Sequence, residues 1–277
     1  MRGTFQSAGQ NCIGIERIIC LPKLYGRLVS ILESRIRSLH VGNPLGGADE
    51  TVQNTTSHGD ENIDVGALIS ASRFPHLESL IRSAISEGAR LLVGGSQFHD
   101  PAYPSGHYFS PTLLVDVTPD MAIANEELFA PICLVMRAAT ITEAINFANS
   151  TPYALGSSVF GQSPSDLENV VRGVRAGMVA VNDFGVTYAV GLPFGGVGGS
   201  GYGRFGGEEG VRSICNVKAV CKDRWAWMGV STSIPLALDY PIKDVERGWR
   251  FVKGVIGVGY ARGWDWLCSL GKVVRNA

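Results

Sequence analysis

Strand-like and helix-like segments alternate along the chain, and this alternation constrains the fold more than any other feature. Short apolar runs typical of buried strands lie at 15–21, 90–93, 108–117, 132–137, 157–160 and 178–181. Between some of these runs, apolar residues recur at helical spacing, over 24–39 and again over 77–85. Strands separated by helices indicate an α/β fold, a three-layer sandwich with a mostly parallel sheet.

Local signals add boundaries to this pattern. Thr140 with Glu143, and Ser165 with Glu168, have the spacing of a capping box, so each pair predicts the start of a helix. Residues 42–63 are rich in Gly, Asp, Asn and Thr without periodicity, which predicts a long loop.

Composition excludes several classes of protein. Hydrophobic residues make up 45% of the 277 positions and charged residues 18%, as in ordinary globular proteins. A formal net charge of −1 gives no electrostatic basis for binding nucleic acid or an anionic membrane. Six cysteines are too few for a disulfide scaffold, which favours reduced thiols and a cytoplasmic location. We also expect no signal peptide and no spanning segment, since no apolar run reaches roughly 18 to 20 residues.

The character of the sequence changes near residue 225. Tryptophans gather from Trp225 onward and the alternation is lost, so we divide the chain into a domain over 1–225 and an appendage over 226–277. In the appendage, apolar residues are mixed with Lys253, Arg262 and Lys272. This mixture suits either an amphipathic segment on a membrane surface or packing against the core or a partner subunit. The sequence favours packing, because tryptophans are usually well buried.

Cys12 is the first candidate for chemistry. It follows Gly-Gln-Asn and precedes the pair Glu16-Arg17. A thiolate attacks carbonyl carbon well, and the N–H group of the same residue can stabilise the oxyanion that forms. The alternative is a buried structural cysteine, the common state of a free thiol. The segment resembles the nucleophile segment of the aldehyde dehydrogenase superfamily, and two further segments match that superfamily in the same order.

The second match is the sequence Asn-Glu-Glu-Leu-Phe-Ala-Pro over 125–131. The resemblance implies that Glu127 hydrogen-bonds the nicotinamide ribose of NAD or NADP, and that Phe129 lies against the nicotinamide ring. A carboxylate suits vicinal hydroxyls because it can accept two hydrogen bonds. The family usually has glycine where Ala130 stands. Taken alone, the acidic pair would be explained as a helix start favoured by the helix dipole.

The third match covers 177–182 and the glycine-rich stretch 192–204. It resembles the family's C-terminal loop near the substrate tunnel, and it implies a substrate-loop role for Asn182, Phe184, Pro193, Phe194 and Gly195. Many members have lysine at the place of Gly198. With 204–210 and 217–220, that difference is most similar to the family 22 branch of plants and fungi. The three matches together span about residues 3–225.

Other motifs are better explained without a function. Residues 201–206 fit G-x-G-x-x-G, but the dinucleotide fingerprint needs a buried strand before it, and residues 195–200 cannot form one. Asn54 and Asn149 match glycosylation acceptors without a secretory context. We expect no metal site, because zinc-ligand spacing is absent from the histidines His40, His58, His76, His99 and His107.

The resemblance implies oxidation of a small-molecule aldehyde to a carboxylic acid with NAD or NADP, through a cysteine thiohemiacetal and a thioester. In the family, an NAD-binding domain, a glutamate base and an asparagine oxyanion donor all precede the cysteine. Only eleven residues precede Cys12 here, so we expect the N-terminal NAD-binding domain to be missing and the 277 residues alone to be inactive. Glu16 follows Cys12 too closely to be an obvious replacement for the base.

Two alternatives remain open. A cysteine-dependent esterase would need only a nucleophile and a base. A non-catalytic fragment could instead pair with full-length subunits, or with itself as a homo-oligomer, through the family's oligomerisation strand near 213–221. Membrane association of the appendage, or of a full-length form, is the less favoured expectation.

Overall fold

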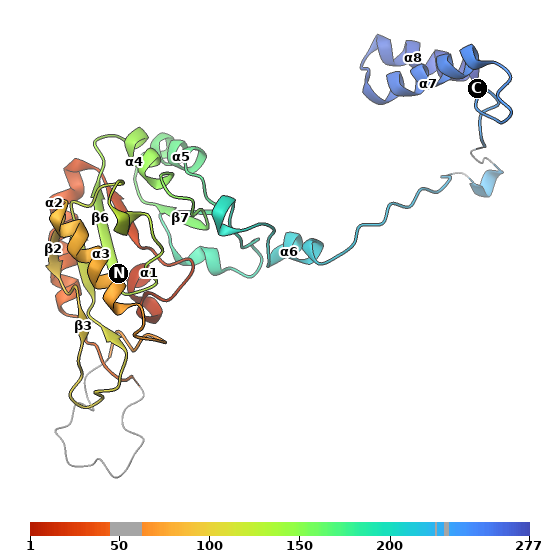
Figure 1. Cartoon of the computed structure of the whole chain (residues 1–277). Coiled ribbons are helices and arrows are strands. Elements are labelled where there is room, and N and C mark those ends of the chain that lie inside the picture. Colours follow the sequence, from red (N-terminus) through yellow and green to blue (C-terminus); the bar gives the residue numbers. More distant parts are fainter. Residues whose placement is uncertain (45–62, 225, 230–232) are drawn as a thin grey trace. The chain divides into compact units, whose positions relative to one another are not determined.

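The structure is a computed structural model that describes residues 1–44, 63–224, 226–229 and 233–277 (Figure 1). His58, the acceptor motif at Asn54 and most of the loop predicted over 42–63 lie outside the described residues, as does Trp225. Two compact units divide the chain, Met1–Asn216 and Val217–Ala277. Their boundary lies nine residues before the predicted one at 225/226.

The first unit is built on a four-stranded sheet. Its strand order is β1 (Arg17–Cys20), β6 (Ile132–Arg137), β5 (Thr112–Val115) and β2 (Arg90–Val93). β6 runs parallel to both β1 and β5, whereas β2 is an antiparallel edge strand. The prediction of a mostly parallel sheet is therefore confirmed.

Both faces of this sheet are covered. Every residue of β5 and the first five residues of β6 are buried, although successive side chains of a strand point to opposite faces. The elements that pack on the sheet are α1 (Arg2–Phe5), α2 (Pro22–Arg37), α3 (Phe74–Ser86) and α4 (Ile141–Ala148). The core gathers residues of the strands, of α2 and α3, and of the turn before Cys12. The three-layer α/β sandwich is thus the observed architecture.

Two smaller sheets complete the unit. β7 (Gly156–Val159) and β8 (Met178–Val181) pair in parallel, and α5 (Pro164–Gly173) connects them. β3 (Gln97–Phe98) and β4 (Tyr108–Phe109) form an antiparallel pair. The short helices are η1 (Gln6–Gly9), η3 (Ala122–Ala124), η4 (Gly185–Tyr188), η5 (Gly198–Ser200) and α6 (Gly207–Ser213).

Two boundaries differ from the sequence expectation. The single strand predicted over 108–117 is two strands, β4 and β5, separated by Ser110 and by Pro111, which has no N–H group for a ladder. The cap of α5 is Ser163 rather than Ser165: its side chain accepts the Asp166 N–H, and Pro164 takes the first helical position. The other cap is confirmed, because the Thr140 hydroxyl accepts the Glu143 N–H at 3.1 Å.

The oligomerisation strand expected near 213–221 is not a strand in this single chain. α6 ends at Ser213, and residues 214–224 are exposed and without regular structure. A strand is defined by hydrogen bonds to a neighbouring strand, and none of the described residues pairs with this segment. Pairing with another subunit therefore stays a prediction.

The second unit is a helical hairpin preceded by η6 (Ala226–Met228). α7 (Val245–Tyr260) packs on α8 (Trp264–Asn276) at close range, since a Cβ atom on Gly257 would lie 2.3 Å from the Ser269 hydroxyl oxygen. Within the unit, Trp249 and Trp264 are exposed. Both interpretations of the appendage stay predictions. None of the helices in the described ranges is long and apolar enough to cross a membrane.

Candidate active site

Cys12 lies in a turn that follows a strained stretch of backbone. Ser7, Ala8 and Gly9 have φ values of 55°, 55° and 76°, in the left-handed region that side chains disfavour. The chain then turns at Cys12, where the Gly14 N–H donates to the Asn11 carbonyl at 2.8 Å. The Cys12 side chain is exposed, and its N–H group donates to no acceptor among the described residues. A thiol and a free N–H group are therefore presented together.

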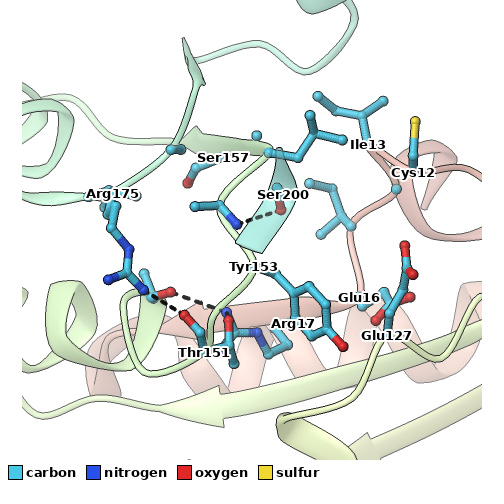
Figure 2. Close-up of a pocket in the computed structure, with 18 of the residues that line it drawn as sticks. Cys12, Ile13, Glu16, Arg17, Glu127, Thr151, Tyr153, Ser157, Arg175 and Ser200 are labelled. Atoms are coloured by element: carbon cyan, nitrogen blue, oxygen red, sulfur yellow. Dashed lines mark hydrogen bonds between the residues drawn. The ribbon is translucent and has the colours of Figure 1, made fainter. Parts of the chain in front are cut away.

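Cys12 lines a cleft of about 510 Å³ in the first unit (Figure 2). One wall is the stretch from Asn11 to Arg17, which leads into β1. Glu126 and Glu127 form part of a second wall, and residues 153–158, which lead into β7, form a third. Cys12 and Glu127 thus line one cleft, although 115 positions separate them in the sequence.

Glu16 holds the segment that carries Glu127 and Phe129. Its carboxylate accepts the Leu128 N–H at 3.1 Å and the Phe129 N–H at 3.0 Å. Burial raises the pKa of the Glu16 carboxyl, and the two backbone donors oppose that shift. With both N–H groups bound, Glu16 is engaged in fixing the backbone and is not presented as a base. Phe129 itself has a φ of 53°, so this is also a strained position.

Two arginines fix another side of the cleft. Arg17 donates to the Phe147 carbonyl at 3.0 Å and to the Ala148 carbonyl at 3.2 Å, at the C-terminal end of α4. Arg175 donates to the Thr151 carbonyl at 2.7 Å. Cations at a helix C-terminus satisfy free carbonyl groups and the helix dipole. Burial lowers the pKa of Arg17, with Glu16 opposing that shift. Both side chains therefore hold the chain that leads from α4 to β7.

Three residues of the glycine-rich loop, 199–201, also line the cleft. The Ser200 hydroxyl accepts the Ala154 N–H at 2.8 Å (Figure 2). Gly199 lies so close to the preceding loop that a Cβ atom there would be 2.8 Å from the Pro152 carbonyl oxygen. Residues 199–201 therefore line the cleft because glycine and serine allow this approach.

The predicted substrate-loop residues lie outside the lining of this cleft. Asn182, with a φ of 53°, accepts the Gly161 N–H at 2.8 Å and so shapes the turn after β8. Phe184 packs edge-on against Tyr188 with ring centroids 6.1 Å apart, and the Tyr188 hydroxyl accepts a hydrogen bond from Asn11. This aromatic pair therefore adjoins the Cys12 turn from another side.

The remaining substrate-loop residues belong to a narrow loop. Phe194 exchanges both backbone hydrogen bonds with Phe205, at 2.7 and 2.8 Å, and their rings are 4.6 Å apart. Pro193 precedes Phe194, and Gly195 follows it. A Cβ atom on Gly195 would lie 2.6 Å from the Gly203 carbonyl oxygen, so glycine leaves room for that carbonyl. Their substrate role stays a prediction, as do the roles of Cys12, Glu127 and Phe129.

Sequence reasoning missed the part that Glu16, Arg17, Arg175 and Ser200 play around the cleft. The pair Glu16-Arg17 did carry a signal, since two charged residues open an otherwise apolar strand. Charged residues in such a run must find partners, but the sequence alone does not name them.

Comparison with known proteins identifies the family. The model of the aldehyde dehydrogenase family matches residues 1–220. The aldehyde dehydrogenase-like protein YHR039C of Saccharomyces cerevisiae is 48% identical over 278 residues, which cover 100% of this chain and 41% of that protein. The aldehyde dehydrogenase-like protein C21C3 of Schizosaccharomyces pombe is 49% identical, covering 100% of this chain and 50% of that protein. The chain thus spans half or less of the length of these relatives.

Solved structures agree with this result. The betaine aldehyde dehydrogenase of Staphylococcus aureus, in complex with NAD+, matches with a TM-score of 0.66 and 30% identity, over 76% of this chain and 39% of that one. The glyceraldehyde-3-phosphate dehydrogenase GapN of Methanocaldococcus jannaschii, complexed with NADP, matches with a TM-score of 0.66 and 31% identity, over 78% and 42%. From its sequence match and its sheet, the chain belongs to the aldehyde dehydrogenase family.

Proposed function

We propose that the first unit is the nucleophile-bearing half of an NAD(P)-dependent aldehyde dehydrogenase. The observation that carries this proposal is the shared cleft, which is lined by two exposed residues, Cys12 and Glu127. Family membership supplies the reaction class, and the cleft supplies a place where a nucleophile and a cofactor-holding acid meet. Its substrate is a small-molecule aldehyde.

In this proposal Cys12 is the catalytic nucleophile. Its thiolate adds to the aldehyde carbon, so that a carbon–sulfur bond forms and the carbonyl electron pair moves to oxygen. The free Cys12 N–H group can donate to that oxyanion. Loss of hydride from the same carbon re-forms the carbonyl as a thioester. Water then adds to the thioester, the thiolate leaves, and a carboxylic acid is released.

The residues present fit a nicotinamide dinucleotide. Glu127 has an exposed carboxylate on the cleft, which can accept hydrogen bonds from ribose hydroxyls. Phe129, two residues on, is partly exposed and would flank the ring. When bound, NAD or NADP supplies the hydride acceptor. This chain's part is to hold the ribose and to orient the ring toward Cys12.

Groups beyond these 277 residues complete the reaction in this proposal. Glu16, the acid nearest to Cys12 in sequence, is bound to two backbone N–H groups, and Glu126 pairs with His76 at 2.8 Å. A general base contributes about a hundred- to ten-thousand-fold in rate. The S. cerevisiae and S. pombe relatives are two or more times as long as this chain, and their additional length has room for a dinucleotide-binding domain.

Association with other subunits is the second part of the proposal. Ile214, Val217 and Val220 are exposed in the irregular segment after α6, and none of the described strands pairs with that segment. Such a segment can add to the sheet edge of a neighbouring chain. We therefore propose that residues 213–221 pair with another copy or with a full-length subunit.

Acylation tests the nucleophile. We would incubate the chain with 4-nitrophenyl acetate and locate the acetyl group by peptide mass spectrometry. The Cys12 peptide should carry the thioester, Cys12→Ala should abolish it, and Cys215→Ala, which removes another exposed cysteine, should leave it unchanged. Acetylation that survives in Cys12→Ala would contradict the proposed nucleophile. Sustained nitrophenol release that depends on Cys12 would instead favour the esterase alternative.

A further inference from the structure

Glu16, four residues after Cys12, binds the segment that carries Glu127 and Phe129. The Glu16 carboxylate lies within 3.1 Å of the N–H groups of Leu128 and Phe129. These two donors follow Glu127 directly. Because both N–H groups aim at one carboxylate, the direction in which the Glu127 and Phe129 side chains leave the backbone is set by Glu16.

Three residues before Cys12, the chain touches the same segment again. Gly9 lies so close to it that a Cβ atom would be 2.1 Å from the Ala130 carbonyl oxygen and 2.9 Å from the Pro131 nitrogen. Ala130 itself is buried with 1% of its surface exposed, so the methyl group that replaces the family's usual glycine is accommodated in the core. The Cys12 turn therefore meets residues 128–131 on both of its sides.

Two further contacts come from the N-terminal end of α3 and hold Glu126 and Glu127, the residues just before Leu128. Arg73 donates to the Glu127 carbonyl at 3.1 Å, and His76 bonds the Glu126 carboxylate at 2.8 Å. Neither contact reaches the Leu128 or Phe129 N–H groups. Among the described residues, Glu16 is the side chain that links these groups to the strand that continues from the Cys12 turn.

We propose that Glu16 is a positioning residue, which fixes the Glu127–Phe129 segment at a set distance from the Cys12 thiol. This inference deepens the proposed function and rests on it. Glu16 acts as a paired hydrogen-bond acceptor for two backbone N–H groups, so its proposed part is to position the segment and not to react. The role requires an acceptor oxygen at the reach of a glutamate side chain, whether or not that side chain is charged.

Hydrogen exchange at the Leu128 and Phe129 amides tests this role in the complete 277-residue chain. Glu16→Ala should raise their exchange rates at least tenfold, because both amides lose their acceptor. Glu16→Gln, with an amide oxygen at the same reach, should restore most of the protection, whereas the shorter Glu16→Asp should not. Glu168→Ala, which removes an exposed partner of Arg172, is the matched control and should leave these amides unchanged.

Protection of β6, over Ile132–Arg137, reports whether each variant is folded. Unchanged exchange at Leu128 and Phe129 in a folded Glu16→Ala chain would overturn the proposal. If Glu16→Ala loses β6 protection, the test is instead the comparison of Glu16→Gln with Glu16→Asp. Equal protection of the Leu128 and Phe129 amides in these two variants would overturn the proposal. The two proposals fail separately. Acylation of Cys12 tests the proposed function, whereas exchange of the Leu128 and Phe129 amides tests the role of Glu16.

Discussion

Two independent features of the structure require glycine at position 9, its backbone angle and its close packing. Its φ of 76° disfavours any side chain, and its close approach to Ala130 leaves no space for one. We expect Gly9→Ala to lower the free energy of unfolding by about 2 kcal/mol or more, because the backbone must shift. Urea denaturation measures this difference. A Gly9→Ala chain as stable as the wild type would contradict the close contact.

Gly26 provides the matched control for that substitution. It lies inside α2, where a Cβ atom would meet nothing within 4 Å beyond its chain neighbours and the backbone of its own helix. Alanine has the higher helix propensity, so Gly26→Ala should raise the free energy of unfolding by about 0.5–1 kcal/mol. The two glycines thus predict opposite signs for the same change.

Glu16 should also make stability depend on pH. Burial raises its pKa above the ordinary value of 4.5. An acid with a higher pKa in the folded chain contributes stability that is complete below pH 4.5 and is lost as the pH rises through the folded pKa. Glu16→Gln cannot ionise, so its Tm should gain on that of the wild type as the pH rises from 4.5 toward neutrality. A Tm difference that stays constant over this range would refute the expectation.

At the scale of elements, the sequence predicted those whose signals are local. The helix over 24–39 appears as α2, and the strand over 132–137 as β6, because their apolar periodicity coincides with the face or faces they bury. The strand predicted over 108–117 failed because its two halves pair with different partners, β4 with β3 and β5 with β2 and β6. Which strand pairs with which is a tertiary property that local pattern does not contain.

The site divides in the same way. Cys12 and Glu127 are predicted from short motifs, because the residues around each of them are contiguous in sequence. The role of Glu16 could not be found, since its two donors lie 112 and 113 positions away along the chain and are backbone groups, which any sequence supplies. When a side chain binds backbone N–H groups, its partner can be almost any residue type, so the sequence carries no signal for the pair.

The hairpin of the second unit depends on close contact between α7 and α8. Gly257→Ala would place a methyl group against Ser269, 2.3 Å from its hydroxyl oxygen and 2.8 Å from its Cβ atom. We expect a loss of about 1–3 kcal/mol in hairpin stability, measured as faster hydrogen exchange over Trp264–Asn276. Gly259→Ala is the control, because a Cβ atom there meets nothing within 4 Å. Equal exchange in the two variants would argue against tight packing.

For the whole molecule, we predict that an assay for aldehyde oxidation will show no activity. The 277 residues alone should produce no measurable NADH or NADPH from aldehydes, because the base and the dinucleotide-binding surface are proposed to lie elsewhere. Absorbance at the reduced nicotinamide band measures this, and the acylation of Cys12 serves as a positive control for the nucleophile. Turnover at rates typical of the family would show that these residues suffice.

The double contact of the Cys12 turn with residues 128–131 has a consequence for how such an enzyme could be assembled. Cys12 and Glu127 come to line one cleft within a single folded unit. Two polypeptides could therefore share the reaction by fragment complementation, with no peptide bond between them. An NAD(P)-binding polypeptide that docked as a separate chain would need only to present the dinucleotide, since the groups proposed to receive it already lie in one folded unit.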